Sequence, residues 1–300
     1  MKIFVALKTT NEPSGGGNQF IRALKKEFGE RDALSSVPSL ADVILFNSHH
    51  HPEDIMLLKE HFPEKIFIHR VDGPMRLYNK PSDQRDDIVY FLNDKIADGT
   101  VFQSNYSRDR NFEAGISKEK PNTVIVNAVP HDVFYRPKTF RDRSATKIRL
   151  ISTSFSTNVR KGFKAYKFLD ENLDFDKFEY TFLGNSPVEF DNIQMKGCLK
   201  TEELASQLRE HDVFITASEN DPCSNSLIEA LSCGLPVVAL DSGGHPELVL
   251  SGGTLYKEKQ NLLAKIEETC YNIEEYRENI ITKNIDAAAN EYLSFFKEVI

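Results

Sequence analysis

Residues 212–240 read DVFITASENDPCSNSLIEALSCGLPVVAL, and this stretch decides the fold. It predicts a buried strand at 213–216, a polar loop, a short helix that ends at Gly234, and a second apolar strand at 236–240. In a strand–helix–strand unit of this kind, the polar loop lies at the carboxyl end of the first strand, where open α/β sheets bind their ligands. The stretch therefore predicts an open parallel sheet with a ligand site in this loop.

The loop offers backbone donors between two acidic side chains. Small hydroxyl and amide side chains leave the first backbone N–H groups of the helix open to an anion. Asp221 stands before the helix, and Glu229 stands one turn into it. This order of groups suits a ligand with a phosphate in the middle and sugar hydroxyls at its ends. The candidate residues in the loop are Asp221, Cys223, Ser224, Asn225, Ser226 and Glu229.

Glu229 also has a purely structural interpretation. Ser226 and Glu229 have the spacing of a capping box, in which the glutamate accepts a hydrogen bond from the backbone N–H of the serine. Such a contact stabilises a helix by about 1 kcal/mol. The substitution Glu229→Gln separates the two interpretations. It should weaken nucleotide binding strongly if Glu229 contacts the ligand, and leave binding nearly unchanged if Glu229 only caps the helix.

Composition limits the class of protein. A chain of 300 residues fits two domains of ordinary size, and 27% charged residues without a long polar tract argue against a large disordered region. The net charge is −8 and its acidic surplus lies in the second half, which disfavours a nucleic-acid partner because phosphate backbones require a basic surface. No apolar run reaches the length of a bilayer and no signal segment is apparent, so we expect a cytoplasmic protein.

A few residues suggest other chemistry. Arg22, Lys25 and Lys26 share one predicted helix face that would suit peripheral contact with anionic lipid, although a solvated face is the simpler interpretation. The four cysteines lack CxxC spacing and paired histidines, which argues against a disulfide framework or a structural zinc. The consecutive histidines of residues 49–51 point to opposite faces of an extended segment, so we expect no metal there.

The first half of the chain alternates strands and helices, which is typical of a doubly wound parallel sheet. Gly15, Gly16 and Gly17 open the first predicted helix, and their bare backbone would let a phosphate or sugar approach closely; the alternative is a flexible surface turn. Phe20 occupies the third glycine position of the dinucleotide fingerprint, which disfavours a nicotinamide enzyme. His69 is predicted to end a strand, where ligands bind, and a hydrogen-bonded structural histidine is an equally good interpretation.

The second half begins after a linker. Residues 138–147 are polar and follow a proline-bounded turn, so we expect one domain at 1–140 and a second at 141–283, with a last helix, about 284–300, that packs back on the first. A strand at 148–153 then leads to a loop that ends in Arg160 and Lys161 before a helix. Because positive charge is disfavoured at a helix N-terminus, these cations are better explained as ligands of a diphosphate.

The motifs together resemble those of family-4 glycosyltransferases of the GT-B fold. Beside the glycine loop and His69, the matching segments are NAVPHDVFYRP (127–137), SFSTNVRKGF (154–163), FLGNSP (182–187), DPCSNSLIEALSCGLPVVAL (221–240) and SGGHPELV (242–249). The chain departs from the family at two positions. Asp221 stands where the family usually has a glutamate, and Ser156 stands where it usually has an arginine, unless Arg160, the neighbour of Lys161, substitutes for it.

The resemblance implies an α/β protein with two Rossmann-like, doubly wound domains that face each other across a cleft. It implies a retaining glycosyltransferase that moves a sugar from a nucleotide-diphosphate sugar, of the UDP or GDP type, to a hydroxyl acceptor without a metal or other cofactor. The acceptor would be a sugar, a lipid-linked or a small molecule, in glycan, polysaccharide or glycolipid synthesis.

The resemblance also implies roles for individual residues. His69, Lys161 and Asp221 would be catalytic: Lys161 neutralises the diphosphate, Asp221 holds donor-sugar hydroxyls, and His69 binds the sugar from the other domain. Glu229 would hold the ribose hydroxyls. The other implied donor-binding residues are Gly15, Gly16, Gly17, Ser154, Arg160, Asn185, Cys198, Leu199, Cys223, Ser224, Asn225 and Ser226.

Alternatives remain from other classes. One is a nucleotide-sugar epimerase of the same fold, with Asp221 recruited for acid–base chemistry. Another is a nucleotide-sugar-binding protein without activity, which the two departures from the family pattern suggest. Asp174 and Asp176 spell DxD, a metal-binding signature of another class of sugar-transfer enzymes, but their place between a predicted helix and strand favours a solvated turn.

Overall fold

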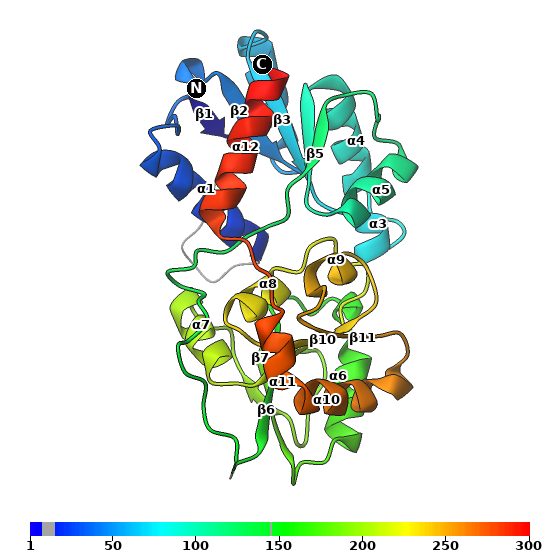
Figure 1. Cartoon of the computed structure of the whole chain (residues 1–300). Helices are drawn as coiled ribbons and strands as arrows, with labels where there is room; N and C mark the ends of the chain where they lie inside the picture. Colours follow the sequence, from blue (N-terminus) through cyan, green and yellow to red (C-terminus); the bar gives the residue numbers. More distant parts are fainter. Residues whose placement is uncertain (8–15, 145) are drawn as a thin grey trace. The chain divides into compact units, whose positions relative to one another are not determined.

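The computed structural model describes residues 1–7, 16–144 and 146–300, and it consists of two α/β units (Figure 1). The first unit holds Asn18–Ala128, Asn284–Ile300 and the N-terminal strand, and the second holds Val129–Lys283 together with Gly16 and Gly17. Each unit has its own parallel sheet. The prediction of two parallel-sheet α/β domains is therefore confirmed.

The first sheet has five parallel strands in the order β1 (Ile3–Val5), β2 (Val43–Asn47), β3 (Ile66–Val71), β4 (Gly99–Phe102) and β5 (Asn122–Val124). An isolated parallel bridge joins Ile3 to Leu34. Since β2 already pairs with β1, this bridge lies on the other side of β1, and the chain order reverses there. The sheet is thus wound in both directions from β1.

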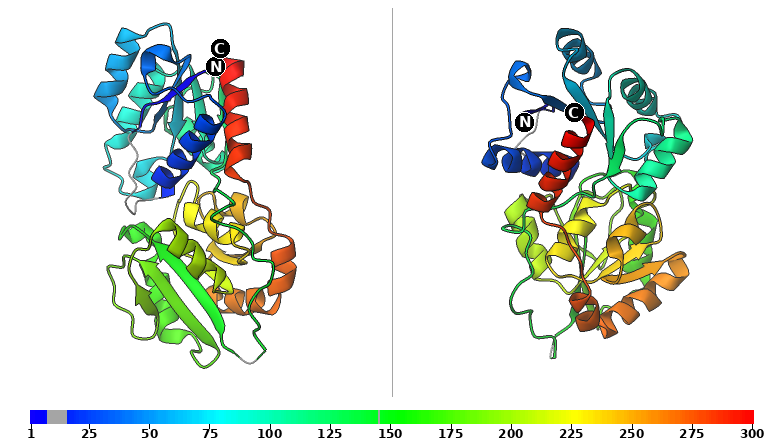
Figure 2. Two further views of the ribbon diagram at one scale, coloured as in Figure 1. Left: turned by 90° about the vertical axis from the view of Figure 1, so that its left-hand side faces the viewer. Right: turned by 45° about the horizontal axis from the view of Figure 1, so that its top comes forward.

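Helices cover both faces of the first sheet because its strands carry apolar side chains on each side. The helices of this unit are α1 (Gly16–Glu30), η1 (Pro38–Leu40), α2 (Pro52–His61), α3 (Met75–Tyr78), α4 (Arg85–Lys95), α5 (Asn105–Ala114) and α12 (Ile285–Val299). Figures 1 and 2 show α1 and α12 on the same face. Phe28 of α1 packs there against Tyr292 and Phe296 of α12. The C-terminal helix therefore completes the core of the first unit.

The division between the units falls after Ala128, twelve residues before the predicted boundary of 140. The backbone carbonyl of Val133 accepts a hydrogen bond of 2.9 Å from Arg209. The ring of Phe140 lies 3.7 Å from the guanidinium carbon of Arg277. The segment after Ala128 thus belongs to the second unit by its packing, although its sequence suggested the end of the first.

The second sheet has six parallel strands in the order β11-β10-β9-β6-β7-β8. Their bounds are β6 (Ile148–Ser154), β7 (Phe178–Gly184), β8 (Gln194–Lys196), β9 (Val213–Thr216), β10 (Val237–Leu240) and β11 (Gly253–Tyr256). The helices are η2 (Val159–Lys161), α6 (Phe163–Asn172), α7 (Thr201–Arg209), α8 (Asn225–Ser232), α9 (His245–Val249), η3 (Lys259–Asn261), α10 (Leu262–Tyr271) and α11 (Ile273–Glu278). The strand order reverses between β6 and β9, which makes their carboxyl ends the expected ligand crevice.

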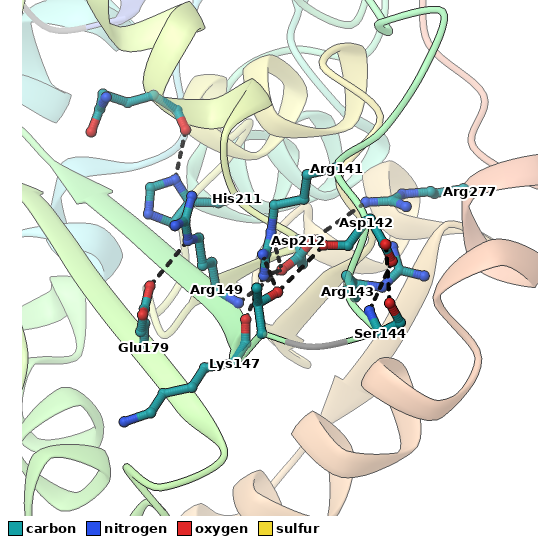
Figure 3. Close-up of polar contacts among 12 residues, drawn as sticks. Arg141, Asp142, Arg143, Ser144, Lys147, Arg149, Glu179, His211, Asp212 and Arg277 are labelled. Carbon is teal, nitrogen blue, oxygen red and sulfur yellow. Dashed lines mark hydrogen bonds and ion pairs between the residues drawn. The ribbon is translucent and has the colours of Figure 1, made fainter.

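A buried carboxylate fixes the linker at the opposite, amino end of this sheet (Figure 3). Asp212 is fully buried directly before β9 and accepts hydrogen bonds from Arg141 Nε at 3.1 Å and from the backbone N–H of Arg149 at 2.8 Å. Arg277 is also fully buried, and its Nη2 lies 4.0 Å from Asp212 Oδ1. This cluster stabilises the second unit and leaves the carboxyl ends of the strands to the loops described next.

Candidate functional site

The loops after β6 and β9 bring Lys161 and Asp221 together at the point where the strand order reverses. Lys161 Nζ lies 2.9 Å from Asp221 Oδ2. The side chains are 20% and 9% exposed, so water screens their attraction only weakly. Two residues that the sequence singled out on separate motifs therefore form one ion pair.

Gly162 permits this arrangement. Its φ is +80°, and a Cβ at this position would lie 2.2 Å from the backbone oxygen of Ala217. Only glycine allows the two loops to approach so closely without strain. Lys161, the preceding residue, is thereby held over the loop that carries Asp221.

Asp221 stays ionised in spite of its burial. Desolvation opposes its charge, but the Lys161 ammonium and a hydrogen bond of 3.2 Å from the backbone N–H of Cys223 outweigh this effect, and the pKa of the carboxyl lies below its ordinary value. An ionised carboxylate can accept hydrogen bonds from sugar hydroxyls. The aspartate can thus perform the chemistry expected of it.

Helix α8 begins beside this pair. Ser224 is its N-cap residue and makes no side-chain capping hydrogen bond. Its hydroxyl oxygen instead lies 3.2 Å from that of Ser226. The helix terminus consequently keeps the partial positive charge that favours an anion.

The capping-box interpretation of Glu229 is wrong in this structure. Helix α8 begins at Asn225, which places Ser226 inside the first turn rather than at the cap. Within the described part of the chain, the Glu229 carboxyl has no hydrogen-bond partner, although the residue is only 5% exposed. Burial raises its pKa to about 8. A buried acid without a partner is a common feature of ligand sites, since structure alone does not repay its cost.

The remaining predicted residues of this unit lie around the same edge. Arg160 forms an ion pair with Glu219, whose backbone N–H also donates to Arg160 O at 2.7 Å. Asn185 Nδ2 donates to the backbone of Phe155 at 2.8 Å, which ties the loop after β7 to the loop after β6. Ser154 ends β6, and Cys198 and Leu199 follow β8 at the edge of the sheet. Asp174 and Asp176, by contrast, precede β7 at the amino edge of the sheet and are exposed.

His69 takes a structural position in the first unit. It lies inside β3, two residues before the end of the strand, and is fully buried. Its Nε2 lies 3.0 Å from Ser48 O, its Nδ1 lies 3.3 Å from Asn93 Nδ2, and its ring stacks on Phe46. Burial lowers its pKa to about 3. These contacts support the structural interpretation that the sequence left open.

The glycine loop is only partly described. Gly15 lies outside the described residues. Gly16 and Gly17 are the first two residues of α1. Their predicted contact with a ligand stays a prediction.

Sequence reasoning missed His245 as a member of this site. It is the first residue of α9 and fully buried, and the Asp221 carboxylate acts to raise its pKa. The motif SGGHPELV was quoted only as one of the segments that carry the family resemblance, and its histidine was given no role. A histidine at a helix start that follows a strand was the available signal.

Two negative observations apply to the described residues. No group of three histidine, cysteine or acidic side chains among them is placed to hold a metal ion. In the same part of the chain, every helix is too short or too polar to cross a bilayer.

Two parallel-sheet units wound in this order define the class of the protein: it has the GT-B fold. A solved structure of sucrose-phosphate synthase from Thermosynechococcus elongatus matches with a TM-score of 0.78 and 13% identity, over 100% of this chain and 99% of that one. HepE from Anabaena, solved in complex with UDP-glucose, matches with a TM-score of 0.69 and 15% identity, over 100% and 98%.

The sequence matches carry the resemblance beyond the fold. Residues 176–272 match the family model described as "Glycosyl transferases group 1". Sulfoquinovosyl transferase SQD2 from Arabidopsis thaliana is 33% identical over 76 residues, which are 23% of this chain and 15% of that relative. The predicted resemblance to GT-B glycosyltransferases is therefore confirmed, while the matched part is a small share of the relative's length.

Proposed function

We propose that this protein is a retaining glycosyltransferase that moves a sugar from a nucleotide-diphosphate sugar to a hydroxyl acceptor. The observation that carries the proposal is the Lys161–Asp221 pair, which lies where the strand order reverses and next to the start of α8. Cation, helix terminus and carboxylate are the groups that a diphosphate linked to a sugar requires. The match to group 1 glycosyl transferases covers α8 and Asp221.

In this proposal, charge on the leaving diphosphate is stabilised by two groups. Lys161 supplies a full positive charge, and the backbone N–H groups around Ser224 and Ser226 supply the partial charge of the helix terminus. Fixed donors aimed at developing charge are usually the largest electrostatic contribution to catalysis. Asp221 holds hydroxyls of the donor sugar, and Glu229 accepts hydrogen bonds from the ribose hydroxyls.

We favour a front-face reaction without a covalent intermediate. Asp221 is a poor nucleophile, because its carboxylate is held by Lys161 and by the backbone N–H of Cys223 and its pKa is lowered. The leaving phosphate oxygen would itself take the proton of the acceptor hydroxyl. A stable bond between sugar and enzyme, trapped with an unreactive acceptor and found by mass spectrometry, would refute this mechanism.

His69 has no role in the proposed reaction, because its ring is enclosed by protein groups. The donor is proposed to be of the UDP type, for which HepE in complex with UDP-glucose is the supporting relative of like fold. The acceptor remains proposed as a sugar, lipid-linked or small molecule, without an added metal. Cytoplasmic location, with peripheral membrane contact, is proposed on the sequence grounds given above.

The test is a comparison of nucleotides followed by a turnover assay. UDP, GDP and ADP are screened for a rise in melting temperature, since a ligand that binds only the folded state stabilises it. The protein is then incubated with donors of the preferred nucleotide, and free nucleotide diphosphate and epimerised sugar are quantified. Release of the nucleotide diphosphate supports transfer, epimerised sugar supports the epimerase, and binding with neither product supports a binding protein.

A matched pair of variants links the result to the site. Lys161→Gln removes the cation beside Asp221 and should abolish most nucleotide release. Lys164→Gln changes an exposed lysine at the start of α6 and should leave release unchanged. Equal activity of the two variants would show that the diphosphate binds elsewhere.

A further inference from the structure

His245 presents a buried nitrogen for which the described part of the chain offers no hydrogen-bond partner. The side chain is fully buried, and its Nδ1 lies 2.8 Å from the backbone oxygen of Leu240 at the end of β10. Because a carbonyl oxygen only accepts, Nδ1 carries a proton. Its Nε2 is buried without a hydrogen-bond partner among the described residues. In the neutral ring, this nitrogen holds an unused lone pair.

The backbone keeps the imidazole next to Asp221. The N–H of Gly244 donates to Asp221 O at 2.8 Å, and the N–H of Asn220 donates to Ser242 Oγ at 2.9 Å. Gly243 has a φ of +63°, and a Cβ there would lie 2.3 Å from Asp221 O. The loop before α9 is thus fastened to the loop after β9, and the ring cannot move away without breaking these contacts.

The charges that act on the imidazole are those of the proposed donor site. Burial lowers its pKa, Asp221 acts to raise it, and Lys161 acts to lower it. The nearby Glu219 is neutralised by Arg160, and Asp241 lies 3.8 Å from Lys257. Glu247 is the acid on α9 itself. The protonation of His245 therefore depends on how close Lys161 stays to Asp221.

A bound diphosphate changes this balance. It attracts the Lys161 ammonium, which at present neutralises Asp221 from 2.9 Å. A buried carboxylate that loses its cation is strongly destabilised. An imidazole with a free nitrogen beside that carboxylate is the group best placed to replace the cation.

We propose that His245 is a positioning residue, which takes a proton from solvent at Nε2 when a diphosphate engages Lys161. The imidazolium then neutralises Asp221 and keeps it ionised toward the donor sugar, while Nδ1–H continues to donate to Leu240. This inference rests on the proposed function, because it needs a nucleoside diphosphate at Lys161. No bond other than N–H is made, and the proton returns to solvent when the nucleotide leaves.

The direct test is the protonation of the ring, read by 15N NMR of the histidine side chains. Spectra at pH 7 are recorded without nucleotide and with whichever of UDP, GDP and ADP stabilises the protein most, and His245 is assigned from the spectrum of His245→Gln. We expect a neutral ring with the proton on Nδ1 in the free protein and protons on both nitrogens in the complex. This measurement does not depend on protons exchanged by Glu229.

His211 is the matched control. It is also buried, its Nδ1 lies 2.6 Å from Gln207 O, and burial lowers its pKa, but it precedes β9 at the amino end of the sheet. Its ring should have the same protonation with and without nucleotide. A change at both histidines would indicate a general conformational response and would overturn the proposal.

The pH profile of nucleotide affinity gives a second measurement. In a Glu229→Gln background, affinity should fall about tenfold per pH unit between the pKa of His245 in the free protein and its pKa in the complex, and it should level off above the latter. His245→Gln should remove this dependence, whereas His211→Gln should keep it. Nucleotide binding with a neutral His245 would overturn the inference and leave the proposed function standing. Failure of all three nucleotides to bind would refute both.

Discussion

Glu229→Gln should make the free protein more stable and make it bind its nucleotide less well. The wild-type carboxyl is 5% exposed, and burial raises its pKa from the ordinary 4.5 to about 8. At neutral pH the folded protein therefore holds a proton that the unfolded chain has lost. Glutamine has nearly the same shape and no charge at any pH, so it avoids this cost.

The size of this stability difference and its pH dependence follow from the raised pKa of Glu229. The folded-state pKa of an acid is raised here, so wild-type stability is greatest below pH 4.5 and falls as the pH rises through about 8. At about 1.4 kcal/mol per pKa unit, the wild type loses roughly 3 kcal/mol by pH 7 and roughly 5 kcal/mol above pH 8. For a unit of this size, each kcal/mol changes the melting temperature by roughly 2–4 °C.

In nucleotide affinity the wild type should exceed the Glu229→Gln variant, which is the reverse of their order in stability. Ribose hydroxyls that donate to Glu229 favour its ionised form, and hydrogen bonds to charged groups contribute about 1.5–3 kcal/mol. The variant should therefore bind the preferred nucleoside diphosphate roughly 10- to 100-fold more weakly. A protein that gains stability and loses affinity by one substitution has a site residue at that position.

The assays are thermal melts between pH 4 and 9 and calorimetric titration with the nucleotide at pH 7. Glu267→Gln, at an exposed position on α10, is the control and should leave both measurements unchanged. If Glu229→Gln melted below the wild type at pH 8, the carboxyl would have a stabilising partner that the structure does not show. An unchanged nucleotide affinity would remove Glu229 from the site.

Three further predictions concern the two units. Burial opposes the charge of Asp170, but hydrogen bonds from the backbone N–H groups of residues 191–193 and an ion pair with Lys167 at 2.9 Å outweigh it and lower the pKa to about 2. Asp170→Asn should cost about 2 kcal/mol in urea unfolding at pH 7, a difference that disappears as the pH falls from 3.8 through about 2. Gly162→Ala should lower the melting temperature and nucleotide release together, because its Cβ would meet the backbone of Ala217; preserved activity would contradict the role of this close approach. Lys120 Nζ donates to three backbone carbonyls at and just after the end of α4. Lys120→Met should therefore destabilise the first unit by roughly 1–2 kcal/mol, measured by hydrogen exchange of α4. The control Lys118→Met should not have this effect.

The strand–helix–strand unit at 212–240 was predictable because local signals agree there. Apolar runs of strand length flank the loop, and Gly234 follows the helix. The structure has β9 at Val213–Thr216 and β10 at Val237–Leu240, as expected. Lys161 and Asp221 could also be selected in advance, since each follows a strand at the carboxyl edge.

Features that depend on other strands could not be predicted. His69 was expected to end its strand. In the structure, β3 continues through Val71, and Arg70 is buried because it donates to the side-chain oxygens of Asn47 at 2.5 Å and Asn127 at 2.7 Å. Both amides come from distant segments, so periodicity along β3 alone cannot reveal them.

The start of α8 was ambiguous for a related reason. Ser224 and Ser226 are both good N-cap residues, and only the second makes a capping box with Glu229. The structure places the cap at Ser224, which releases Glu229 from that contact. The choice between two serines separated by one residue depends on how the loop around Asp221 is held, and local sequence does not contain that information.

The two cations of the site differ in how readily a ligand can engage them. Arg160 is paired with Glu219 through side chains that are 36% and 43% exposed, so solvent and salt weaken the pair and a diphosphate can compete for the arginine. Lys161 is paired with an almost completely buried Asp221, where separation without compensation is costly. Arg160 is therefore suited to first contact with the diphosphate, and engagement of Lys161 requires a second positive charge near Asp221. The Nε2 of His245, which is buried without a hydrogen-bond partner among the described residues, meets this requirement.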